Sequence, residues 1–126
     1  MSHVLLVDDD EDMVRMTERW FKKDGYEVET ALSGQEALVS LAVRKPDLIV
    51  LDYAMPGMDG CQTFRAIRGE EAFRDIPVIF RTGNDDEGVA GIMEQLGPDG
   101  VVPKSEGRAS LMQAAAGILN GRFGGL

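Results

Sequence analysis

Aspartates follow two of the apolar runs in this sequence, and carboxylates placed there can bind a cation or accept a phosphoryl group. Residues 48–51 are Leu-Ile-Val-Leu and end in Asp52, which opens a proline- and glycine-containing turn over residues 53–60. Residues 4–7 are equally apolar and are followed by Asp8-Asp9-Asp10. Acidic residues are seldom buried without a partner, so a carboxylate that ends a core strand is a specifically placed group.

The two runs are expected to end at the same edge of a sheet. In an open parallel sheet the carboxyl ends of the strands lie together, and ligands bind there. Asp8, Asp9 and Asp52 would then converge. Two like charges about 4 Å apart repel by about 4 kcal/mol at an effective dielectric near 20, so the cluster needs a cation or raised pKa values. Mg²⁺ fits, because it takes oxygen ligands and few protein contacts. Asp10 is interpreted as the N-cap of the following helix.

Further polar groups end the later apolar runs. Thr82 follows the run that ends in Ile79-Phe80-Arg81, and Lys104 follows Val101-Val102-Pro103. A hydroxyl and an ammonium beside carboxylates favour a site for a transferring phosphoryl group, with a carboxylate oxygen as nucleophile. Arg81 either faces outward or reaches the acidic cluster.

The elements that must position these groups follow from the pattern of the chain. Short apolar runs alternate with stretches of helical periodicity, which predicts a parallel sheet covered by helices on both faces. The predicted strands are residues 4–7, 26–30, 48–51, 76–80 and 101–102, and the helices carry apolar faces at residues 13–21, 37–42, 61–67, 89–96 and 111–119. Ser33 is expected to cap the second helix. Asp24-Gly25 and Asn120-Gly121 are expected to end the first and fifth helices.

The composition limits the class of protein. A chain of 126 residues, 44% of them hydrophobic, is expected to form one domain. The net charge of −9 argues against binding to a nucleic acid backbone or an anionic membrane. Cys61 is the only cysteine, which favours a reducing compartment. No signal peptide or membrane span is expected. His3, the only histidine, is interpreted as structural or solvent-facing.

Taken in order, these residues resemble the receiver domain of two-component response regulators. The resemblance rests on Val4-Leu5-Leu6-Val7-Asp8-Asp9-Asp10, on Leu51-Asp52-Tyr53-Ala54-Met55-Pro56-Gly57-Met58-Asp59-Gly60, on Thr82 after Pro77-Val78-Ile79-Phe80, and on Lys104. It implies an α/β fold of the flavodoxin-like (βα)5 type, a doubly wound parallel sheet of order 2-1-3-4-5. A single receiver domain is then expected over residues 1–126, with a core of about residues 3–120 and a glycine-rich C-terminal tail.

The resemblance also implies roles for the site residues. Asp52 corresponds to the phosphoacceptor, Thr82 to the switch hydroxyl and Lys104 to the phosphate-contacting lysine. Asp9 and Asp52 correspond to direct Mg²⁺ ligands, together with the Ala54 carbonyl, and Asp8 to a ligand through water.

The implied function is that of a phosphorylated switch. The domain would accept a phosphoryl group from a sensor histidine kinase or a histidine phosphotransfer protein, and would catalyse only its own phosphorylation and dephosphorylation. It would be cytoplasmic, a monomer or weak homodimer, and would signal to an unknown output protein through the surface of helix four, strand five and helix five. Gly88 and Gly91 weaken helix four, because glycine costs about 1 kcal/mol relative to alanine in a helix.

Some residues depart from the family pattern. Ser105 follows Lys104, where receivers usually have a proline with a cis bond, so this bond is either a strained cis peptide or trans. Val101 stands where an aromatic switch residue is usual. These departures keep open a receiver-like scaffold that acts by protein binding without phosphorylation.

Two other classes fit less well. A phosphatase or phosphotransferase with an aspartyl nucleophile would need an acid two residues after Asp52, where Ala54 stands. A flavin carrier would need a phosphate-binding first loop, and Asp8-Asp9-Asp10 would repel a phosphate. The sequence leaves open the kinase, the output partner, the pathway, and whether the domain stands alone or belongs to a larger regulator.

Overall fold

The structure is a computed structural model that describes residues 2–83, 91 and 95–123, with the backbone alone at 122 and 123. Its elements are β1 (His3–Val7), α1 (Glu11–Lys23), β2 (Glu27–Ala31), α2 (Gly34–Val43), β3 (Leu48–Asp52), α3 (Gly60–Gly69), η1 (Glu71–Phe73), β4 (Val78–Thr82), β5 (Gly100–Pro103), η3 (Lys104–Glu106) and α5 (Gly107–Phe123). The helix predicted at residues 89–96, with Gly88, lies outside the described residues except for Gly91, Gln95 and Leu96.

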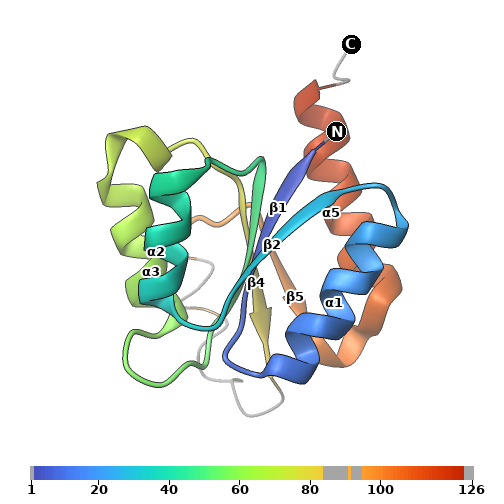
Figure 1. The fold of residues 1–126 in the computed structure, drawn as a ribbon, viewed down its shortest axis with the longest axis horizontal. Helices are drawn as coiled ribbons and strands as arrows, with labels where there is room; N and C mark the ends of the chain where they lie inside the picture. Colours follow the sequence, from blue (N-terminus) through green and yellow to red (C-terminus); the bar gives the residue numbers. More distant parts are fainter. Residues whose placement is uncertain (1, 84–90, 92–94, 124–126) are drawn as a thin grey trace.

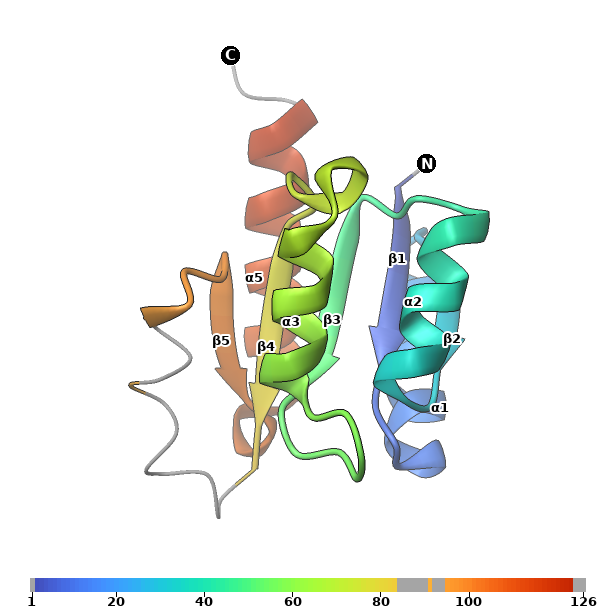
Figure 2. The ribbon, with the colours of Figure 1, turned by 90° about the vertical axis from the view of Figure 1, so that its left-hand side faces the viewer.

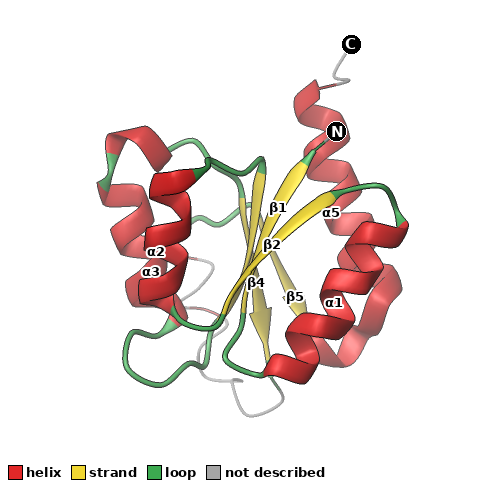
Figure 3. Cartoon of the chain, in the orientation of Figure 1, coloured by secondary structure: helices red, strands yellow, loops and turns green. Residues whose placement is uncertain are grey.

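The strands form one parallel sheet in the order β2-β1-β3-β4-β5, which confirms the predicted flavodoxin-like topology. Figure 2 shows this order across the sheet. Helices α2 and α3 cover one face and helices α1 and α5 the other, as Figures 1 and 3 show. The described part of the chain contains no helix with the length and apolar character that crossing a membrane requires.

The central strands supply side chains to two cores, one on each face. Alternate residues of a strand point to opposite faces. Val7, Leu51 and Phe80 pack on the α2–α3 face, whereas Leu6 and Val50 pack on the α1–α5 face. The uninterrupted apolar runs are therefore those of strands buried on both sides. The same alternation places the next residue of each strand on the α1–α5 face, and these residues are polar or charged.

The helix ends follow their capping residues with one exception. Ser33 caps α2 by accepting a hydrogen bond from the Glu36 amide, as predicted. Gly25 adopts φ +92° and ends α1, also as predicted. The prediction that Asn120-Gly121 ends α5 is wrong, since the helix continues to Phe123. Gly121 is not among the glycines with positive φ, and a glycine that keeps helical angles weakens a helix without ending it.

Strand boundaries differ from the predictions by one or two residues. The fourth strand, predicted at residues 76–80, runs from Val78 to Thr82. Pro77 has no amide to donate to the sheet, so β4 begins at Val78, although the Pro77 carbonyl still accepts a hydrogen bond from the Ile49 amide at 2.9 Å. Arg81 and Thr82 are therefore parts of β4 and do not belong to the loop that follows it. The second strand similarly begins at Glu27, one residue later than predicted.

Candidate functional site

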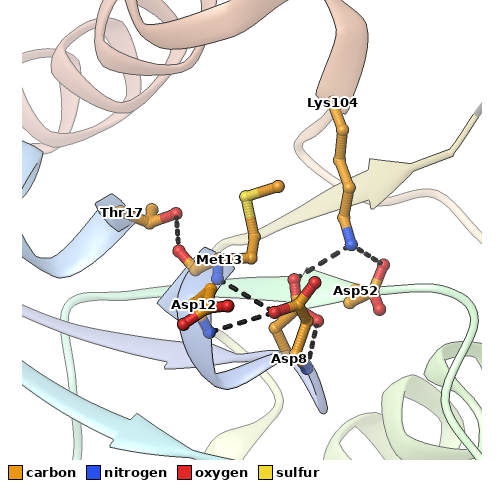
Figure 4. A network of polar contacts seen from close by, with 7 residues as sticks. Asp8, Asp12, Met13, Thr17, Asp52 and Lys104 are labelled. Carbon is orange, nitrogen blue, oxygen red and sulfur yellow. Dashed lines mark hydrogen bonds and ion pairs between the residues drawn. The ribbon is translucent and has the colours of Figure 1, made fainter. Parts of the chain in front are cut away.

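Asp8 is held at the end of β1 by a local turn. The residue is 6% exposed, and its amide donates a hydrogen bond to the Ala31 carbonyl at 3.1 Å. Asp8 Oδ1 accepts a hydrogen bond from the Asp10 amide at 3.0 Å. Asp10 in turn accepts from the amides of Asp12 and Met13 and caps α1, as the sequence indicated. The turn therefore separates the two acids, leaving Asp8 directed toward Asp52 (Figure 4).

Asp52 closes β3 and is 2% exposed. The backbone after it is fixed, because the Tyr53 amide donates to the Arg81 carbonyl at 3.0 Å and the Gly60 amide donates to the Tyr53 carbonyl at 2.8 Å. A Cβ atom on Gly60 would lie 2.5 Å from the Asp52 carbonyl oxygen and 2.7 Å from the Tyr53 Cα. Only glycine allows α3 to begin in direct contact with this backbone. Sequence reasoning missed this role of Gly60.

A capping box holds the start of α3 in the same place. Asp59 accepts a hydrogen bond from the Gln62 amide at 2.8 Å, and the Gln62 side chain accepts from the Asp59 amide at 2.9 Å. This reciprocal pair satisfies amides that the first helical turn leaves without partners. An acid followed three residues later by glutamine was the signal that could have found it.

Lys104 joins the two buried carboxylates. Its Nζ lies 3.0 Å from Asp8 Oδ2 and 3.1 Å from Asp52 Oδ1, and Figure 4 shows the ammonium between them. The lysine is the first residue of η3, directly after Pro103 at the end of β5. No peptide bond is cis in the described part of the chain, so the bond between Lys104 and Ser105 is trans. The ammonium thus reaches Asp52 without the cis geometry that the family usually shows.

Burial and charge shift the pKa values at this point. Burial, and secondly the Asp8 carboxylate, raise the pKa of Asp52 to about 7, although Lys104 opposes the change. Burial alone would lower the pKa of Lys104, but its contacts with Asp8 and Asp52 outweigh burial and raise it. Lys104 therefore stays charged, while Asp52 is close to a change of protonation near neutral pH.

The acids fit a small oxygen-coordinated cation. Asp8, Asp9 and Asp52 each offer one carboxylate oxygen, and these atoms lie within 4.8 Å of one another. Oxygen ligands on opposite sides of Mg²⁺ are about 4.2 Å apart, since each lies about 2.1 Å from the ion. Asp9 is exposed, which leaves room for the waters that Mg²⁺ retains. Ala54, the fourth predicted ligand, lies in the exposed turn after Asp52.

The remaining candidates lie beside this network. Thr82 is 8% exposed at the end of β4, one residue beyond the register partner of Asp52, and is not part of the lysine–carboxylate network. Val101 is the register partner of Phe80 and packs against the α2–α3 core. Arg81 is 4% exposed, which excludes the outward-facing alternative. His3 is 3% exposed at the other end of the sheet, which excludes the solvent-facing alternative for it.

Comparison with known sequences identifies relatives of one kind. Residues 4–116 match the family described as "Response regulator receiver domain". The transcriptional regulatory protein PrrA of Mycobacterium tuberculosis is 37% identical over 121 residues, covering 94% of this chain and 50% of PrrA. The response regulator PleD of Caulobacter vibrioides is 41% identical over 87 residues, covering 69% of this chain and 19% of PleD. The chain thus spans about half the length of PrrA and less of PleD.

Solved structures agree with the sequence matches. The chemotaxis protein CheY4 of Vibrio cholerae superposes with a TM-score of 0.86 at 28% identity, covering 94% of this chain and 98% of CheY4. The receiver domain of a signal transduction histidine kinase from Syntrophus aciditrophicus superposes with a TM-score of 0.89 at 29% identity, covering 96% and 92% of the two chains. With its sheet order and its acidic cluster at the strand ends, the chain belongs to the response regulator receiver domain family of two-component signalling.

Proposed function

We propose that this domain is a phosphorylation-dependent switch in which Asp52 accepts a phosphoryl group in a Mg²⁺-dependent reaction. Receiver domains pair with histidine kinases and output domains, so the donor is a sensor histidine kinase or a histidine phosphotransfer protein. The observation that carries the proposal is the ammonium of Lys104 between Asp8 and Asp52, with a third carboxylate alongside. A purely structural cluster has no need of a third acid beside an already compensated pair.

The residues divide the chemistry between them. A carboxylate oxygen of Asp52 attacks the phosphorus, and Lys104 offsets the negative charge that the phosphoryl group brings. The hydroxyl of Thr82 donates a hydrogen bond to a phosphoryl oxygen once the group has arrived. Asp8, Asp9, Asp52 and the Ala54 carbonyl would hold Mg²⁺, which supplies positive charge for the phosphoryl oxygens.

The output is proposed to be a protein contact made through β5, η3 and α5. Lys104 is the first residue of η3, and α5 starts directly after η3. A change of charge at Asp52 therefore acts on the segment that connects β5 to α5, because Lys104 in that segment forms an ion pair with the Asp52 carboxylate. The third part of the predicted signalling surface, the helix at residues 89–96, lies mostly outside the described residues.

Labelling with acetyl phosphate tests the proposal. The wild-type protein should gain the mass of one phosphoryl group in the presence of Mg²⁺ and far less in a chelator. Asp52→Asn should not be labelled, and Asp9→Ala should need more Mg²⁺. An unlabelled wild-type protein in saturating Mg²⁺ would contradict the proposal and favour a scaffold that acts without phosphorylation.

A second variant tests the switch separately from the chemistry. Thr82→Ala should still be phosphorylated, because Asp52 is the nucleophile, but amide chemical shifts in β5 and α5 should change less on phosphorylation. Thr63→Ala is a matched control, since Thr63 is also buried but donates its hydroxyl within α3 to the Asp59 carbonyl. A full response in the Thr82 variant would show that the signal reaches α5 without the Thr82 hydroxyl.

A further inference from the structure

Arg81 is a buried charge that the phosphorylation chemistry described so far does not use. It follows three apolar residues in β4 and is 4% exposed. Its register partners are Asp52 on β3 and Val102 on β5. Strand alternation places it on the α1–α5 face, where Asp52 and Asp8 also lie. Burying a guanidinium among apolar side chains is strongly unfavourable unless charges or hydrogen bonds compensate it.

Arg81 does not have the contacts of a structural arginine. In the described part of the chain its Nε has no hydrogen-bond partner. Arg68 shows the alternative, since it donates to the Ile76 carbonyl at 2.8 Å, pairs with Asp99 at 3.6 Å and stacks on Phe64 at 4.6 Å. An arginine that only supports the fold is expected to be satisfied in this way.

The surroundings of Arg81 are those of the acidic cluster. With Asp8 and Lys104 it lines a small cavity between the sheet and α1, closed on the helix side by Met13 and Thr17. The carboxylates whose charges act on it are Asp8, Asp52 and Glu106, which oppose the effect of burial on its pKa. The guanidinium is thus a second positive charge at the same strand ends as Lys104.

The net charge of the site determines how the Arg81 guanidinium affects the binding of ions there. Asp8, Asp9 and Asp52 carry three negative charges when ionised, and Lys104 supplies one positive charge. The remaining negative charge attracts a divalent cation and repels a dianionic phosphoryl donor. A buried guanidinium at close range repels the divalent cation and attracts the phosphoryl donor. Salt screens its charge less than it screens a surface charge.

We propose that Arg81 is a second cationic residue of the phosphoryl-transfer site. Its charge attracts the phosphoryl donor and weakens binding of the divalent cation. The inference rests on the proposed function of Asp52. With acetyl phosphate as donor, an oxygen of Asp52 forms the new P–O bond, and the P–O bond to acetate breaks. Acetate leaves with the bonding electron pair and no proton is transferred. Arg81 takes no covalent part and offsets the charge of the incoming phosphoryl group.

Arg81→Met is the informative variant, because methionine keeps an unbranched side chain and removes the charge. Binding of Mg²⁺ is measured by calorimetry on the unphosphorylated protein, and labelling of Asp52 by acetyl phosphate is measured at saturating Mg²⁺. The variant should bind Mg²⁺ about three- to tenfold more tightly and be labelled about tenfold more slowly, because a nearby charge is removed and no direct hydrogen bond to the phosphoryl group is lost. Arg81→Lys, which keeps the charge, should restore both values toward wild type.

Arg44→Met is the matched control for net charge. Arg44 pairs with Glu27 on the surface at 2.6 Å, and both side chains are about half exposed. This variant should leave Mg²⁺ affinity and labelling within about twofold of wild type in about 0.15 M salt, because screening removes its effect on the site.

The directions of change separate the outcomes. Tighter Mg²⁺ binding with slower labelling supports the proposal, since damaged packing would weaken both. Unchanged Mg²⁺ affinity, or weaker binding together with slower labelling, would overturn it and make Arg81 a structural residue. If the wild-type protein is not labelled at all, the proposed function fails, and the Mg²⁺ affinities of the methionine and lysine variants alone decide the role of Arg81.

Discussion

The two ends of the sheet bury polar side chains in opposite ways. At the amino end of β1, His3 is 3% exposed, and neither ring nitrogen has a hydrogen-bond partner in the described part of the chain. Its Nε2 lies 4.0 Å from Glu29 Oε1. Burial, followed by the charge of Arg44, lowers its pKa, so the ring stays neutral. At the carboxyl end, the buried carboxyl groups of Asp8 and Asp52 both lie within ion-pair distance of the partly exposed ammonium of Lys104.

This difference indicates at which end of the sheet a ligand can change the stability of the native state. A neutral buried ring carries no charge, so it stores no electrostatic repulsion that a bound ion could relieve. Charged groups held at close range in a partly dry site store electrostatic free energy, and a ligand that relieves this repulsion is bound. Four changes test this contrast, and their expected effects on stability decrease from the first to the last.

Lys104→Met should produce the largest effect. Without the ammonium, Asp8 and Asp52 remain buried with less compensation. Removing one partner of a buried ion pair destabilises by about 3–5 kcal/mol, and we expect the lower end because Lys104 is partly exposed. Urea unfolding at pH 8 in chelator measures the change in the free energy of unfolding. Lys45→Met, an exposed lysine, is the control. Equal stability of the two variants would show that the carboxyl end stores little free energy.

Asp52→Asn should stabilise the metal-free protein at pH 8 and have almost no effect at pH 4. The pKa of Asp52 is raised from 3.8 to about 7, so between these values the native state holds a proton that the unfolded state has lost. The stability of the wild type therefore falls as pH rises through this window. The full shift of about three pKa units corresponds to at most about 4 kcal/mol. Screening and local relaxation reduce this, so the asparagine variant, which lacks the dependence, should gain on the order of 2 kcal/mol. A less stable variant at pH 8 would mean that Asp52 is a structural hydrogen-bond acceptor.

Mg²⁺ should raise the melting temperature of the wild type. At a concentration about tenfold above its dissociation constant, a ligand stabilises the native state by about 1.4 kcal/mol through mass action. The double variant Asp9→Ala/Asp52→Ala should show no such increase in a thermal scan. An equal increase in the double variant would place cation binding elsewhere on this acidic protein.

His3→Gln should have the smallest effect, confined to acidic pH. The pKa of His3 is lowered from 6.5, so below that value the unfolded state binds a proton that the native state excludes. The His3 contribution to stability should therefore be lost as pH falls from 7 to 5, opposite in sign to the larger Asp52 contribution, and glutamine, which does not titrate, should remove it. Urea midpoints at several pH values measure it. A difference in slope between the wild type and the glutamine variant as large as that caused by Asp52→Asn would contradict the contrast between the two ends.

The sequence predicted those parts of the site that depend on the ends of the strands. Asp8 and Asp52 each follow an uninterrupted apolar run, so their convergence needed only the rule that parallel strands share a carboxyl edge. The direction of Arg81 could not be predicted in the same way. Its face depends on whether β4 ends at residue 80 or at residue 82, and a shift in pairing by one residue exchanges the two faces.

Other features depend on packing between segments that are distant along the chain. The end of α5 was mispredicted because a glycine ends a helix only when it leaves helical angles, which its neighbours decide. The closeness of Gly60 to the Asp52 carbonyl was equally inaccessible, because the pattern of apolar residues gives the existence of β3 and α3 but not their separation.

Gly60 also limits how segments of this domain can be exchanged with those of related domains. The carbonyl oxygen of Asp52 lies only 2.5 Å from the position that a Cβ atom at residue 60 would take, so the strand, the turn of residues 53–59 and the first turn of the helix pack as one unit. A loop graft that replaces the turn alone would have to reproduce this contact. A chimera with a related domain should therefore have its junctions before Leu48 and after Gln62, so that residues 48–62 are transferred together.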